Sequence, residues 1–237
     1  MTGTLLWRGM LAGVLAALLA TLFARAVAEP QIDRAIAVEE THAAHGPGMP
    51  VEEELVSRAT QKGIGLLTAL ALYGAAVGGV FALTFAYGYG RLARIGPRSF
   101  ALLLAGLAFV LIVVVPSLKY PQTPPAVGKH ETVALRTAAY FGMVVLSIGA
   151  AVLAVRLRGA LARVRGGLDA TLPACGAYVG IVGLGQFLLP TIDEVAPDFP
   201  ATLLWNFRVA SFGTALVLWG TIGVTFGLWA ERVLQRQ

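Results

Sequence analysis

The chain has 237 residues, of which 57% are hydrophobic and only 13% are charged. Soluble domains carry about 25% charged residues, so this composition excludes an ordinary soluble domain and indicates a membrane protein. The formal net charge of +5 lies in short clusters between apolar runs, which is typical of membrane loops rather than of a nucleic-acid-binding surface. A single cysteine, Cys175, excludes an intramolecular disulfide and a thiolate metal cluster.

Six apolar stretches are long enough to cross a bilayer, whose hydrocarbon core of about 30 Å needs about 20 helical residues. They cover residues 5–28, 63–89, 99–115, 132–155, 172–189 and 203–230. Because lipid cannot satisfy free backbone groups, each stretch is expected to be a helix. The sequence therefore predicts an all-α, polytopic membrane helix bundle that forms a single transmembrane domain over residues 1–237.

The first stretch has an alternative interpretation as a cleaved signal peptide. Ala26 and Ala28 stand in the small-residue positions of a cleavage site, and cleavage would leave five spans. However, Arg25 interrupts the region before the cut, and the apolar stretch exceeds the usual signal core of about 7 to 15 residues. We therefore expect a retained first span.

The connectors between the stretches alternate in charge. Two connectors are basic and hold Arg91, Arg94 and Arg98, and Arg156, Arg158, Arg163 and Arg165. Two others are acidic: the loop 29–62 holds seven carboxylates, and the fifth connector holds Asp193, Glu194 and Asp198. Because basic loops tend to stay in the cytoplasm, the acidic connectors are expected outside and both termini inside.

The external loop begins with carboxylates at helical spacing. Glu29, Asp33 and Glu40 line one face if a helix or a kinked continuation begins at Pro30, a residue that the first helical turn tolerates. Arg25 lies one turn before Glu29 and can pair with it. This face is the proposed start of a cation-binding site.

Two histidines follow in the same loop. His42 and His45 are three residues apart, so on a helical turn both rings could reach one divalent cation, with a nearby glutamate supplying oxygen. This ligand set suits cobalt, nickel, zinc or iron alike. The alternative is that both histidines are solvated loop residues.

Arginines intrude near the outer ends of three spans, at Arg25, Arg136 and Arg208. A charge inside the bilayer is costly, so such residues normally snorkel, pair with an acid or face a polar cavity. We hypothesise that they meet Asp193, Glu194 and the carboxylates of the first loop at the outer face. The competing interpretation is a set of structural ion pairs. Lys119 and Tyr120 are either anchors at the membrane interface or members of this cluster.

Small residues recur at a spacing of four, which lets helices approach closely in lipid. The pairs are Gly9 and Gly13, Gly74 and Gly78, Gly176 and Gly180, and Gly223 and Gly227. We predict that they are packing positions. No internal repeat is visible.

An enzyme is not expected. The segment "EELVSR" at 53–58 matches the Glu-Glu-x-x-x-Arg of CAAX-type intramembrane proteases, but those enzymes need histidines on later helices, and here every histidine lies in a loop. No His-Glu-x-x-His zinc motif, Gly-x-Ser-x-Gly elbow or phosphate-binding glycine loop is present.

Three blocks together resemble one family nearly end to end. They are "LLWRGMLAGVLAALLATLFARAVAEPQIDRAIAVEE", "LKYPQTPPAVG" and "LPTIDEVAPDFPATLLWNFRVAS". The family is CbtA, the proposed cobalt transporter subunits. The residues carried over are Glu29, Pro30, Asp33, Arg34 and Glu40, then Lys119, Tyr120, Pro121 and Pro125, and finally Asp193, Glu194, Phe199, Pro200, Trp205 and Arg208.

The resemblance implies a cobalt permease component of a bacterial inner membrane, linked to cobalamin biosynthesis. It also implies a partner, a small single-span CbtB-type subunit with a histidine-rich end. The family is usually described with five spans, whereas the apolar stretches here number six. No cofactor is expected, and Co²⁺ would be the transported ion.

We therefore expect a permease subunit whose external site captures Co²⁺ through Glu29, Asp33, Glu40, Asp193 and Glu194, with His42 and His45 as further candidates. Arg25, Arg34, Lys119, Arg136 and Arg208 balance charge or hold the structure. One alternative is a scaffold that anchors the partner helix without transport. Another is transport of nickel or a different divalent cation, because ligand preferences overlap.

Overall fold

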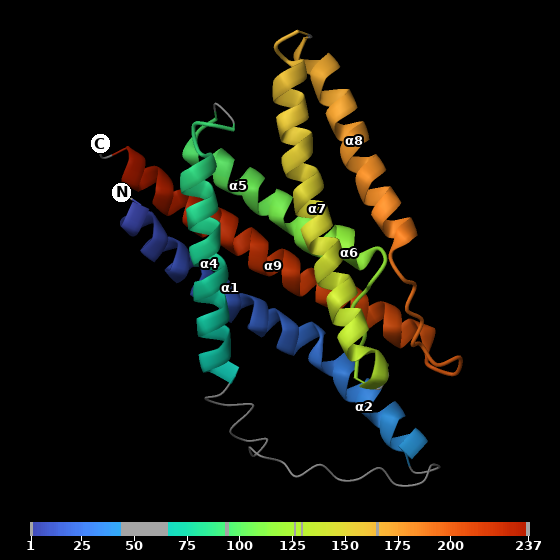
Figure 1. Cartoon of the computed structure of the whole chain (residues 1–237). Helices are drawn as coiled ribbons and strands as arrows, with labels where there is room; N and C mark the ends of the chain where they lie inside the picture. The colour runs from blue at the N-terminus through green and yellow to red at the C-terminus, as the bar shows by residue number, and fades with distance from the viewer. Residues whose placement is uncertain are drawn as a thin grey trace. The chain divides into compact units, whose positions relative to one another are not determined.

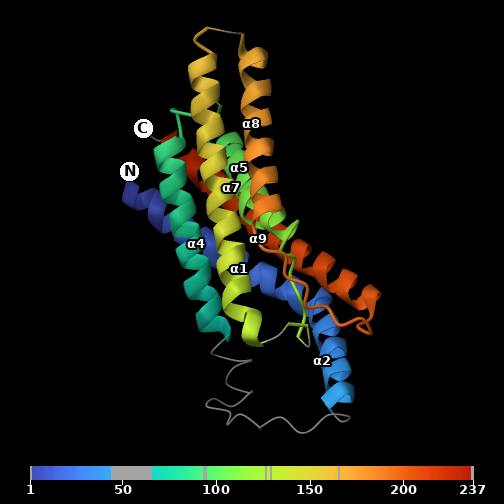
Figure 2. The same cartoon turned by 45° about the vertical axis from the view of Figure 1, so that its right-hand side comes forward.

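The computed structural model describes residues 2–43, 66–92, 95–125, 127–128, 130–164 and 166–235 (Figures 1 and 2). The regular elements that these residues form are all helices. Six of the helical segments are long and apolar enough to cross a membrane. The predicted all-α membrane bundle with six spans is confirmed.

The helices in chain order are α1 (Thr2–Val27), α2 (Glu29–Ala43), α4 (Leu66–Gly88), α5 (Pro97–Ala108), the π-helix η2 (Phe109–Val114), α6 (Val115–Ser117), the 3₁₀ turn η3 (His130–Thr132), α7 (Val133–Leu161), α8 (Gly167–Leu188) and α9 (Ala201–Leu234). The third span is the run α5, η2 and α6, Pro97–Ser117. The fourth and sixth spans end beyond their predicted limits because arginine and leucine continue the helix well.

The chain forms two compact units, each with its own core. Unit 1 comprises Met1–Ala108, Pro124–Ala126 and Pro200–Gln237, and so contains α1, α2, α4, α5 and α9. Unit 2 comprises Phe109–Thr123 and Val127–Phe199, and contains η2, α6, η3, α7 and α8. The third span thus contributes its first half to unit 1 and its second half to unit 2.

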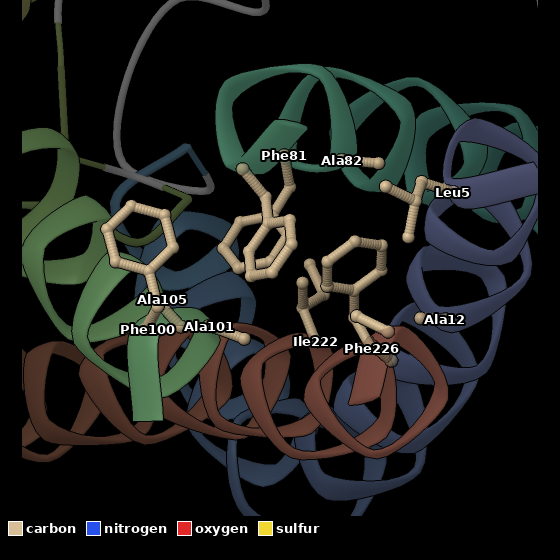
Figure 3. Close-up of a cluster of buried hydrophobic side chains, with 12 residues drawn as sticks. Leu5, Ala12, Phe81, Ala82, Phe100, Ala101, Ala105, Ile222 and Phe226 are labelled. Carbon is tan, nitrogen blue, oxygen red and sulfur yellow. The ribbon is translucent and has the colours of Figure 1, made fainter. Parts of the chain in front are cut away.

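Unit 1 is held by aromatic side chains from α4, α5 and α9. Phe226 meets Phe81 edge-on at a centroid distance of 5.4 Å and Phe85 at 5.0 Å. Figure 3 shows Phe81 and Phe226 directed toward one another from α4 and α9. Phe85 also lies 5.4 Å from Phe100 of α5. Such edge-to-face and tilted pairs add specific geometry to the burial of large apolar surfaces.

Glycines bring α1 and α4 of unit 1 into backbone contact. A Cβ atom added at Gly74 would lie 2.5 Å from the carbonyl oxygen of Gly13. A Cβ at Gly13 or Gly78 would likewise overlap a backbone carbonyl of the facing helix, that of Gly74 or Gly9 respectively. Both pairs therefore serve as the packing positions that the sequence predicts.

The other two glycine pairs differ from each other. A Cβ at Gly223 would lie 2.8 Å from the Cβ of Ala105, so this pair of α9 packs against α5 as predicted. At Gly176 and Gly180 of α8 no heavy atom of the described residues lies within 4 Å of the added Cβ. The prediction is wrong there, because α8 packs on α7 through another face, which carries Ala170, Ala174 and Val182.

Both ends of the chain lie at the same end of unit 1 (Figure 1). Nη1 of Arg8, near the start of α1, donates a hydrogen bond of 2.7 Å to the carbonyl oxygen of Trp229, near the end of α9. Arg98, in the first turn of α5, lies 3.5 Å from Glu231. The start of α1, the start of α5 and the end of α9 thus share one end of unit 1.

Unit 2 is built on α7 and α8, which lie side by side in both views (Figures 1 and 2). Met143 of α7 is fully buried, and Val115 of α6 and Val182 of α8 join the same core. The hydroxyls of Ser147 and Tyr178 lie 3.0 Å apart and join the two helices. Hydrogen bonds between hydroxyl groups are a common means of joining helices in lipid.

Candidate functional site

The first group of predicted site residues lies on α2. This helix begins at Glu29, with only Ala28 between it and the end of α1, and Pro30 stands in its first turn as the sequence predicts. Glu29, Asp33 and Glu40 are exposed, and their spacing places them on one face of the helix. Unit 1 therefore presents an acidic helix face directly after its first span.

The structure describes little of the two predicted histidine ligands. His42 belongs to the last turn of α2, but its side chain is outside the described residues, as is the whole of His45. Within the residues that the structure describes, no group of three or more His, Cys, Asp and Glu side chains is placed to hold a metal ion. In the described part of the chain, the acidic face of α2 is a row of carboxylates.

Asp193 and Glu194 are neighbours in unit 2 with opposite surroundings. The Glu194 side chain is only 4% exposed, and its carboxylate accepts hydrogen bonds from Arg136 and Thr132 at the start of α7. Asp193 is exposed and accepts a backbone hydrogen bond of 3.4 Å from Val195. The Glu194 carboxylate is therefore neutralised by a guanidinium group, while the Asp193 carboxylate is exposed.

The backbone of Gly128 lies close against this ion pair. Its φ of +129° is a conformation that residues with a side chain rarely adopt, and an added Cβ would lie 2.5 Å from Nη1 of Arg136 and 3.2 Å from Oε2 of Glu194. Sequence reasoning missed both Gly128 and Thr132. The available signal was a glycine that ends the proline-rich connector only a few residues before Arg136.

Lys119 and Tyr120 hold the end of α8. Pro190 has no N–H, so it cannot donate the helical hydrogen bond to the carbonyl of Gln186, and Nζ of Lys119 donates to that carbonyl instead. The Tyr120 hydroxyl donates to the carbonyl of Pro190 at 2.7 Å. Burial raises the pKa of the Tyr120 phenol, which keeps this donor protonated further into the alkaline range than an exposed tyrosine. Both residues therefore belong to the polar framework of unit 2.

Replacing Lys119 with methionine is expected to lower the free energy of unfolding by about 1.5 to 3 kcal/mol, the usual contribution of a hydrogen bond to a charged group. Methionine keeps the apolar stem but leaves the Gln186 carbonyl without its donor at the negative end of the α8 dipole. The thermal midpoint of the purified protein in detergent measures the loss. Leu118→Met, at an exposed neighbour, is the control and should leave the midpoint unchanged.

The remaining predicted basic residues lie in unit 1. Arg25 is exposed in the last turn of α1, and Arg34 is exposed on α2. Arg208 is half-buried in the third turn of α9. The basic residues thus divide between the units, with Lys119 and Arg136 in unit 2.

The arrangement gives the two acidic segments different chemistry. The exposed carboxylates of α2 can attract a hydrated cation without giving up other partners. Glu194 is buried and already accepts hydrogen bonds from Arg136 and Thr132, so a cation that binds it must compete with the Arg136 guanidinium group for its negative charge.

A comparison with protein families finds one family that covers nearly the whole chain. The family model described as "Probable cobalt transporter subunit (CbtA)" matches residues 2–231, a range that includes all the described helices except the last residues of α9. No curated protein and no solved structure matches the chain. The chain belongs to the CbtA family of probable cobalt transporter subunits.

Proposed function

We propose that this protein is the membrane subunit of a bacterial inner-membrane importer of Co²⁺, linked to cobalamin biosynthesis, with both termini in the cytoplasm. The observation that carries the proposal is the family match across residues 2–231, which covers the first five candidate spans and all but the last three residues of the sixth. The basic connectors support the orientation, since arginine-rich loops stay on the cytoplasmic side.

The acidic face of α2 is the proposed point of capture. Glu29, Asp33 and Glu40 are exposed, so a hydrated divalent cation can collect there before any of its water is replaced. His42 and His45 supply imidazole nitrogens close by in the sequence, and Asp193 supplies a further carboxylate. Charge, rather than a rigid ligand set, then determines this first step.

The partner is proposed to be a small single-span CbtB-type subunit with a histidine-rich end. The family description supports a partner because it names a subunit. Imidazole groups bind Co²⁺ and Ni²⁺ well, so a histidine-rich end can hold the ion near the membrane surface.

Uptake of radiolabelled cobalt and nickel tests the function. Cells that lack other importers are compared with and without this chain, each with and without the partner. Cobalt accumulation that needs both proteins is the expected result. Accumulation of nickel but not cobalt would indicate a nickel transporter. If neither metal accumulates, the protein is better described as a scaffold that does not transport.

The double change Asp33→Asn and Glu40→Gln is expected to reduce cobalt uptake several-fold at low concentration and little at saturation, because local ion concentration falls with the negative charge. The conservative change Asp33→Glu should stay near the wild-type rate. Asp169→Asn, an exposed acid at the start of α8, is the matched control. Unchanged uptake in the double variant would contradict capture by α2.

A further inference from the structure

Beyond Arg136, side chains with a hydroxyl or thioether group continue along the same face of α7. Tyr140, Met143 and Ser147 follow Arg136 at spacings of four, three and four, which keeps all four on one side of the helix. Ser147 lies eleven residues after Arg136, about 16 Å along the helix axis. The row therefore spans about half of a hydrocarbon core of about 30 Å.

The polar atoms of this row meet partners inside unit 2. The Tyr140 hydroxyl donates to the carbonyl of Ile112 at 3.0 Å, and the Ser147 hydroxyl lies 3.0 Å from that of Tyr178. Met143 and Ser147 are both 0% exposed, so the inner half of the row is enclosed by protein rather than by lipid.

The helix facing this row is distorted. Pro116 cannot donate the α-helical hydrogen bond to Ile112, and the segment that precedes it, Phe109–Val114, is a π-helix. Nε2 of Gln186 also donates to the carbonyl of Val115 at 2.9 Å. Distorted backbone at membrane depth occurs where protein covers it or where it lines a polar passage, and π-helical turns are frequent at functional sites.

In the neighbouring turns of α7 and α8, the two helices pack through small apolar side chains. There the buried positions are the alanines Ala150, Ala170 and Ala174. Alanine lets two helices approach without any polar group. The hydroxyl, thioether and carbonyl groups nearer Arg136 are therefore concentrated in one part of unit 2, on the Arg136 side of these alanines.

We propose that the α7 polar row, defined as Glu194, Arg136, Tyr140, Met143, Ser147 and Tyr178, is the outer half of a path for a divalent cation through unit 2. The inference rests on the proposed function and names its route. A cation displaces Arg136 from Glu194 and then exchanges its water for hydroxyl, carbonyl and thioether groups in turn. Successive weak ligands let the ion enter and leave.

Cysteine accessibility tests the route. The background is Cys175→Ala, which removes the single native thiol. Ser147→Cys is compared with Val145→Cys, whose side chain is 70% exposed at the apolar surface of α7. A second pair, Tyr178→Cys and Val179→Cys, guards against poor folding of one variant. All are expressed with the partner in native membranes and treated with a membrane-impermeant methanethiosulfonate.

Cysteine at 147 or 178 is expected to react about tenfold faster than at 145 or 179, because a path that admits a hydrated cation also admits water, and only a hydrated thiol ionises. Added CoCl₂ should slow that reaction. Equal rates within both pairs, or rates that Co²⁺ does not change, would overturn the route. Cobalt uptake measured in the same cells separates the two proposals: absent uptake by the unaltered chain overturns the function, whereas normal uptake with unreactive cysteines overturns only the route.

Discussion

Changing Gly13 to alanine is expected to leave little correctly folded protein. The added methyl group would overlap the carbonyl oxygen of Gly74 and lie 2.9 Å from Cα of Gly78, and these are backbone atoms that cannot rotate away. Relief requires α1 and α4 to separate, which exposes the buried small residues of α1, including Ala12 and Ala16. We expect a loss of more than about 3 kcal/mol, at the upper end of overpacking effects.

The yield of monodisperse protein in mild detergent, together with its thermal midpoint, measures this effect. Gly180→Ala is the matched control, since it has the same spacing within its own pair but no described heavy atom within 4 Å. It should be neutral or slightly stabilising, because alanine favours a helix over glycine by about 1 kcal/mol. Equal behaviour of the two variants would contradict the α1–α4 contact.

The second large effect is expected at the ion pair of unit 2. Arg136→Ala leaves the Glu194 carboxylate, only 4% exposed, without its guanidinium partner, and breaking a buried pair in this way costs about 3 to 5 kcal/mol. The double change Arg136→Met and Glu194→Gln removes both charges and should recover most of the loss. Thermal unfolding of the single and double variants measures the coupling between the two residues.

The neighbouring acid provides a control for this experiment. Asp193→Asn changes an exposed carboxylate and should alter stability by no more than about 0.5 kcal/mol. A stable double variant that no longer transports cobalt would assign Glu194 to the ion path as well as to the structure. Equal losses for Asp193→Asn and Arg136→Ala would contradict the burial of the pair.

The spans could be predicted from sequence because their cause is local: a bilayer needs a run of apolar residues, and each run shows in the composition. The predicted third span ends at Val115, before Pro116, whereas the helix continues to Ser117. A proline normally ends such a helix, but the π-helical turn before Pro116 accommodates it. That accommodation depends on contacts from α7 and α8, which a single segment does not reveal.

The fate of individual polar residues depends on tertiary contacts. Nothing in the sequence distinguishes Asp193 from Glu194, yet only Glu194 turns toward Arg136 and Thr132. In the same way, two glycines four residues apart do not reveal which helix packs against them. The Lys119 contact did have a local signal, since a proline four residues after Gln186 leaves the carbonyl of Gln186 without its helical donor.

The length of α9 bears on the cost of the arginine within it. At 34 residues the helix rises about 51 Å, far beyond a hydrocarbon thickness of about 30 Å, and a tilt of about 20° recovers only a few ångströms. Hydrophobic mismatch of this size is relieved by letting the ends emerge among the headgroups. Arg208 lies seven residues from the start of α9, about 10 Å along it, so its guanidinium group can reach lipid phosphate. The thickness of the bilayer then determines the free-energy cost of placing the Arg208 charge there.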